Sequence, residues 1–86
     1  MIKQVFSLQE DLFVLSELQL TAAAEKQVGS YLQTIETAPS RAHLDKRLDQ
    51  VSGYLQALDD FNLLNDQQFI LLRELVTRAS MRSLLS

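Results

Sequence analysis

Apolar residues recur every three to four positions through most of the chain, which is the spacing of amphipathic helices. The first such pattern begins after Ser7, which forms a capping box with Glu10, and it continues to about Glu36. Gly29 interrupts the pattern and could end one helix before another begins. Because a glycine inside a helix costs only about 1 kcal/mol relative to alanine, we predict one long helix that bends at Gly29. Two helices that split at Gly29 are the alternative.

A break at residues 37–40 separates this first helix from a second one. Pro39 disfavours helical geometry in the residue before it and suits the first turn of a new helix. We predict the second helix from about Ser40 to Phe61. Its apolar residues alternate spacings of four and three, a heptad pattern that indicates close antiparallel packing: Leu44, Leu48, Val51, Leu55 and Leu58.

The sequence around Asn62 predicts a tight turn into a third helix. Asn62 suits the left-handed conformation that ends a helix, because its short amide tolerates positive φ. Asn65 and Gln68 form a second capping box, and Leu64 and Phe69 flank it as a hydrophobic staple. The short turn forces the second and third helices to pack antiparallel.

Residues 55–69 resemble the helical hairpin of the short C-terminal domain family, which is found in many bacterial proteins. In that family a leucine-rich helix leads through a Gly-Leu-Leu or Gly-Leu-Ile turn to a capped helix with an early Phe. Here Asn62 stands in place of the Gly, and Gln68 in place of the usual acid. The resemblance implies an interaction role for this hairpin.

These elements predict an all-α fold for residues 1–86. We expect a single domain that is a small antiparallel bundle of three helices, or of four helices if the first breaks at Gly29. Two Gly and one Pro are too few for a sheet with many turns, and the absence of Cys excludes disulfides and thiolate chemistry. No apolar run approaches the roughly 20 residues of a membrane span, and the N-terminus lacks a secretory pattern, so we expect a cytoplasmic protein. The resemblance of residues 55–69 implies a protein of bacterial type.

Two of the predicted helices carry more apolar residues than one core needs. These residues lie on a second face of the first helix and opposite the main stripe of the third helix. Contiguous exposed apolar patches usually mark interfaces. We therefore predict a homodimer whose interface contains Phe13, Leu20, Ala24, Tyr31, Ile35, Ile70, Met81 and Leu84. If the first helix instead splits at Gly29, its second piece could cover this face in a monomeric four-helix bundle.

Residues with candidate chemistry are few. His43 is the only histidine, and no nearby aspartate shares its helix face, so a solvated role is favoured over catalysis. Asp59, Asp60 and Asp66 bracket the predicted turn, but they lack the Gly-containing twelve-residue loop of an EF-hand calcium site. We expect no catalytic residue, no metal site and no cofactor.

The charge distribution favours a protein as the partner. The chain has a net charge of −3 at pH 7, and nucleic-acid binding usually requires a basic face. Arg73, Arg78 and Arg82 form a basic group near the C-terminus, where cations complement the helix dipole. The leading hypothesis is a non-enzymatic, self-associating adaptor, small regulator or chaperone that binds another protein and no membrane. A DNA-binding transcriptional regulator and an enzyme or metal-binding bundle are the alternatives.

Overall fold

The computed structural model describes residues 7–85, and within that range it contains helices and no strand. The helices are α1 (Leu8–Ser16), α2 (Ala22–Glu36), α3 (Arg41–Asp60) and α4 (Asp66–Leu85). The all-α prediction is confirmed for this part of the chain. None of these helices is long and apolar enough to cross a membrane, as far as the described residues show.

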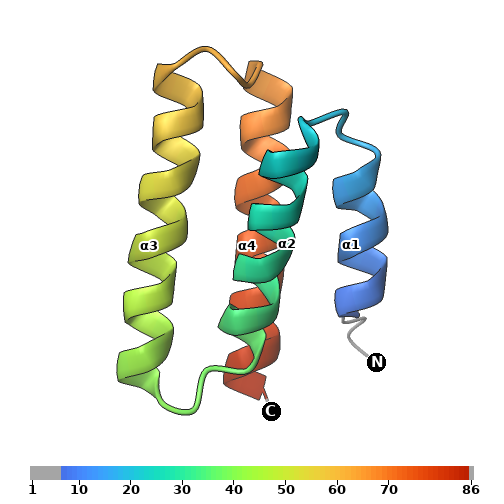
Figure 1. The fold of residues 1–86 in the computed structure, drawn as a ribbon. Coiled ribbons are helices and arrows are strands. Elements are labelled where there is room, and N and C mark those ends of the chain that lie inside the picture. Colours follow the sequence, from blue (N-terminus) through green and yellow to red (C-terminus); the bar gives the residue numbers. More distant parts are fainter. Residues whose placement is uncertain (1–6, 86) are drawn as a thin grey trace.

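The centre of the molecule is the pair formed by α2 and α4 (Figure 1). α1 packs on one side of this pair and α3 on the other, and α1 makes no contact with α3 within the described helices. The chain reverses direction from each helix to the next, so α1 runs against α2 (Figure 1). The principal extents are 37 × 29 × 19 Å, which makes the bundle flattened, with α1 and α3 at its edges.

One apolar core joins the four helices, but α1 contributes little to it. Leu15 is the only apolar residue of α1 that is fully buried, whereas each longer helix supplies at least three buried residues. The apolar heptad residues predicted for the second helix face this core, and Leu48 among them is partly buried at the edge of the core. The buried apolar residues are Leu15, Ala24, Val28, Leu32, Ile35, Leu44, Val51, Leu55, Leu58, Leu64, Leu72, Leu75 and Ala79.

The predicted long first helix is wrong, because the chain turns at residues 17–21 to give α1 and α2. Gln19 adopts positive φ (59°) in this turn, and the Thr21 hydroxyl caps α2 by accepting a hydrogen bond from the Ala24 N–H at 3.1 Å. α2 continues through Gly29, so the alternative of four helices has the right number but places the break wrongly. Folding α1 back buries Leu15, a gain in tertiary packing that local helix preference does not include.

The predicted turn between α3 and α4 is present. Asn62 has a φ of 58°, and the Leu63 N–H donates to the Leu58 carbonyl at 2.9 Å, which is the backbone bond of a Schellman stop. The Asn65 N–H donates to Gln68 Oε1 and the Gln68 N–H donates to Asn65 Oδ1, both at 2.8 Å. These two bonds confirm the second capping box.

Candidate functional site

A buried carboxylate lies between α1 and α4. Asp11 on α1 is 0% exposed. Its Oδ1 accepts a hydrogen bond from Arg78 Nη1 at 3.1 Å, and its Oδ2 accepts one from Arg82 Nη1 at 2.6 Å. Arg78 and Arg82 are four residues apart on α4, so both side chains reach the same side of that helix. Asp11 therefore ties the short edge helix to the centre of the molecule.

Glu36 extends this cluster to the C-terminal end of α2. Arg82 Nε donates to Glu36 Oε1, and Arg78 also pairs with the exposed Glu74 at 3.4 Å. Burial alone would lower the pKa of Arg82, but its hydrogen bonds to Asp11 and Glu36 outweigh burial and raise that pKa. Acids and arginines neutralise one another here, and the cluster joins α1, α2 and α4.

Sequence reasoning missed this cluster. It treated the C-terminal arginines as partners of the helix dipole and assigned no role to Asp11. A signal was present, because Asp11 lies four residues before Leu15, which places a charged residue within the apolar stripe of α1. The long-range partners on α4 could not be assigned from that signal alone, because they depend on how α1 folds back.

Exposed apolar side chains remain on α1 and α4. Phe13 is 66% exposed and Ile70 is 64% exposed, and Met81 and Leu84 are also exposed. The spacing of Ile70, Met81 and Leu84 puts them on one side of α4. We refer to Phe13, Ile70, Met81 and Leu84 as the outer apolar residues.

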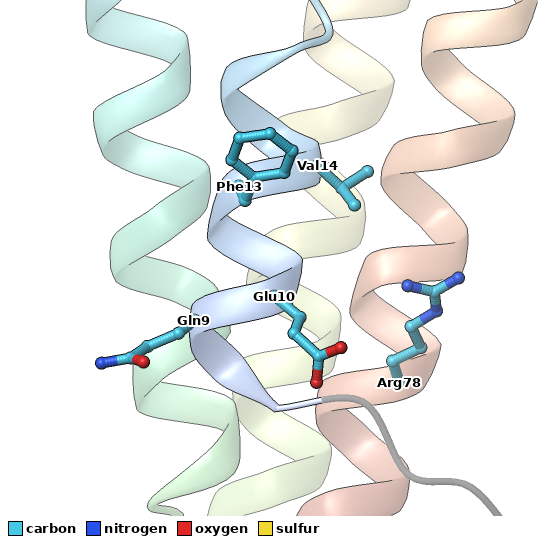
Figure 2. A pocket seen from close by; sticks show the side chains of 5 residues that line it. All are labelled: Gln9, Glu10, Phe13, Val14 and Arg78. Atoms are coloured by element: carbon cyan, nitrogen blue, oxygen red, sulfur yellow. The ribbon is translucent and has the colours of Figure 1, made fainter.

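A surface hollow lies beside Phe13, where α1 approaches α4. It has a volume of about 490 Å³ and is lined by Gln9, Glu10, Phe13, Val14 and Arg78 (Figure 2). Figure 2 shows that α1 supplies the aromatic ring, the Val14 methyl groups and the Glu10 carboxylate, while Arg78 reaches in from α4. The hollow thus combines an apolar wall with one acid and one base.

The other residues predicted for the interface lie in or against the core. Ala24 and Ile35 are buried, and Leu20 and Tyr31 are partly buried against the core. The ring of Tyr31 lies 5.7 Å from that of Tyr54 on α3. These residues were expected on a free helix face, but α2 has neighbours on both sides once α1 folds back. The dimer prediction now depends on the outer apolar residues.

The residues with candidate chemistry are dispersed. His43 is exposed in the first turn of α3, where its Nδ1 lies 2.7 Å from the hydroxyl of Ser40, the residue that caps this helix. Asp60 accepts a hydrogen bond from Gln56 at 3.0 Å. Within residues 7–85, no three His, Asp or Glu side chains are grouped so that they could hold a metal ion.

Comparison with protein-family models, curated proteins and solved structures found no match to this chain. The resemblance of residues 55–69 to the short C-terminal domain family therefore remains a local one.

Proposed function

We propose that this chain is a non-enzymatic helical interaction module that self-associates as a homodimer and acts by binding another protein. The observation that carries the proposal is the exposure of the outer apolar residues, Phe13, Ile70, Met81 and Leu84. Each large apolar side chain gains about 1.5–3 kcal/mol when it is fully buried. Leaving this many in water on a small bundle favours a protein surface that covers them.

The hollow beside Phe13 suits a second copy of the same chain. In a two-fold dimer both copies use the same surface patch. A residue of this patch on one copy therefore contacts a different residue of the same patch on the other copy. Glu10 and Arg78 lie beside the apolar wall of Phe13 and Val14. Arg78 already pairs with Asp11 and Glu74 within the chain, so the apolar wall of Phe13 and Val14 is the part of the hollow that a second copy would cover.

The ion pairs favour protein over DNA as the partner. Arg78 pairs with Asp11 and Glu74, and Arg82 pairs with Asp11 and Glu36. These acids offset the positive charge that a phosphate-binding surface needs. Arg78 and Arg82 therefore act within the fold and give little support to the alternative of a DNA-binding regulator.

Two charged substitutions test the proposal. Phe13→Glu and Ile70→Glu should each convert the dimer to a monomer in light scattering, because each would bury an unpaired charge in the interface. Both side chains are mainly exposed, so helix content measured by circular dichroism should not change.

Phe61→Glu is the matched control, because Phe61 is 77% exposed in the turn between α3 and α4 and is not an outer apolar residue. This variant should remain dimeric. A monomeric parent would overturn the proposal, and so would equal behaviour of Phe61→Glu and the two interface variants.

A further inference from the structure

We propose that α1 exchanges between two copies of the chain, so that each α1 occupies on its partner the site on α2 and α4 that it occupies here within one chain. The inference rests on the proposed self-association and specifies how the two copies associate. Two closed copies meet through the outer apolar residues, and exchange then makes the dimer long-lived. In the exchanged form, residues 17–21 become helical and residues 8–36 form one continuous helix.

The first observation concerns the turn at residues 17–21. The turn has the sequence Glu-Leu-Gln-Leu-Thr and contains neither Gly nor Pro. Gln19 is held at a φ of 59°, a left-handed conformation that is unfavourable for residues other than Gly, Asn and Asp. The turn between α3 and α4 places Asn62, a residue suited to this conformation, at its positive-φ position. Leu, Gln and Glu are good helix formers, so residues 17–20 favour a continuous helix, whereas Thr21 caps α2 and favours the turn.

The second observation is that α1, among the helices that the structure describes, contacts only the two central ones. Figure 1 shows α1 at the edge of the molecule, opposite α3. Its contacts are with α2 and α4, and it packs antiparallel to α2 (Figure 1). Suppose that residues 8–36 form one helix in each chain. A two-fold axis perpendicular to these helices and close to Gln19 would place them antiparallel to each other. Each α1 would then lie along the partner's α2 in the same relative direction as in the closed form.

The third observation explains why the occupant is a second copy and not another helix. Asp11 is completely buried, and its charge is balanced by Arg78 and Arg82 at a fixed spacing on α4. A helix with Asp11 is stable in this site only where both arginines meet it, because an unpaired buried charge is very costly. Gln68 Nε2 also donates to the Leu18 carbonyl at 2.8 Å, within the turn that opens on exchange. An identical chain reproduces the contacts of Asp11 with both arginines, whereas the bond at Leu18 belongs to the closed form.

Cross-linking between two single-cysteine variants tests the exchange. The natural chain has no Cys, so Leu12→Cys and Gly29→Cys each introduce one reactive thiol. Leu12 Cδ2 lies 3.4 Å from the position that a Cβ on residue 29 would occupy. The two variants are unfolded together, refolded as a mixture and treated with a short bifunctional thiol reagent. Exchange brings the two thiols of different chains together, whereas closed copies keep Leu12 beside the Gly29 of the same chain.

We expect a cross-linked product that contains one chain of each variant, identified by mass spectrometry under denaturing conditions. Each variant treated alone is the control for chance collisions. If the mixed product does not exceed that background while circular dichroism shows folded variants, exchange is overturned.

Variants of the turn give a second readout. Gln19→Gly relieves the left-handed conformation and weakens the continuous helix, so it should lower the exchanged fraction by about fivefold or more for each turn. Gln19→Ala is the matched control, because it keeps a Cβ at the positive φ and favours the continuous helix. It should give at least as much mixed product as the parent sequence. An increase of mixed product with Gln19→Gly would contradict the proposal.

Failure of the exchange can be distinguished from failure of the proposed function. A parent chain that is dimeric by light scattering but gives no mixed product retains self-association and excludes exchange. A parent chain that is monomeric at high micromolar concentration excludes both.

Discussion

Asp11 of α1 belongs to an ion-pair cluster that connects three helices. It pairs with Arg78 and Arg82 of α4, and Arg82 in turn pairs with Glu36 of α2. Such a cluster need not stabilise a protein more than apolar packing would, because desolvation of the charges offsets their attraction. Its effect is selective, since it permits α1 to dock only where both arginines meet Asp11.

Replacement of Asp11 tests this role. Asp11→Asn keeps the shape of the side chain but removes the buried carboxylate that pairs with the partly buried Arg78 and Arg82. We expect the free energy of unfolding to fall by about 1.5–3 kcal/mol, as for the loss of hydrogen bonds to charged groups, measured by urea denaturation. Glu74→Gln removes the exposed acid paired with Arg78 and should cost less than about 1 kcal/mol. Similar losses for the two variants would contradict the account.

The N-terminus of α1 contains a second acid with a distinct environment. The Ser7 N–H donates to Glu10 Oε1 at 2.8 Å, and the Glu10 N–H donates to the Ser7 hydroxyl at 3.1 Å. The Ser7 backbone, and then its hydroxyl, lower the pKa of Glu10. The ionised carboxylate therefore stabilises the folded state above the unfolded pKa of Glu10, and this stabilisation is lost as the pH falls through the lowered folded pKa.

A titration of the Glu10 side-chain carboxyl by NMR should show a pKa below that of an ordinary glutamate. Ser7→Ala should raise this pKa part of the way back, because the backbone N–H of residue 7 remains as a donor. An ordinary pKa for Glu10 in the parent chain would show that the capping box is not formed in solution.

Among the elements, the hairpin of α3 and α4 could be predicted from the sequence because its signals are local. Asn62, Asn65 and Gln68 act on backbone groups within a few residues of themselves. The turn at residues 17–21 could not be predicted in this way. Gln19 is not a typical turn residue, and the turn is stabilised by the packing of Leu15 into a core whose other residues lie far away in the sequence.

The contrast between local signals and the chain path also explains which of the predicted interface residues are exposed. Phe13, Ile70, Met81 and Leu84 could be recognised because they lie opposite the apolar stripes of their own helices. Ala24 and Ile35 are also opposite a stripe, but α2 is covered on both sides after α1 folds back. Whether a second face is buried depends on the chain path, which helical periodicity does not specify.

The α3–α4 hairpin can be tested with one substitution at the cap of α4 and one among the buried heptad residues of α3. Asn65→Ala removes the side-chain acceptor of the capping box and should destabilise the fold by about 1 kcal/mol. Leu58→Ala opens a cavity in the core and should cost about 2–5 kcal/mol. Denaturant melts measure both, and neutral results for the pair would contradict the assigned turn.

Replacement of Gly53 should stabilise the fold, in contrast to the two substitutions in the hairpin. It lies in the middle of α3, and a Cβ added there would have no other atom within 4 Å. Gly53→Ala should therefore stabilise the fold by about 0.5–1 kcal/mol, since alanine is the better helix former. Gly29→Ala should gain less, because its methyl group would lie 3.4 Å from Leu12 Cδ2. A thermal melt compares the two, and a loss of stability with Gly53→Ala would contradict the packing of α3.

At the scale of the whole molecule, the bundle has a central pair of helices and a lightly anchored edge helix. A chain of this length buries only about 60% of its unfolded surface as a monomer. The outer apolar residues and the turn at residues 17–21 both favour association with a second copy. Self-association is therefore the central claim about this molecule.

Sedimentation equilibrium of the unmodified chain, across the micromolar range, tests that claim most directly. The account predicts an average mass that rises with concentration from the monomer mass to twice that value. A mass that stays at the monomer value up to high micromolar concentration would contradict it.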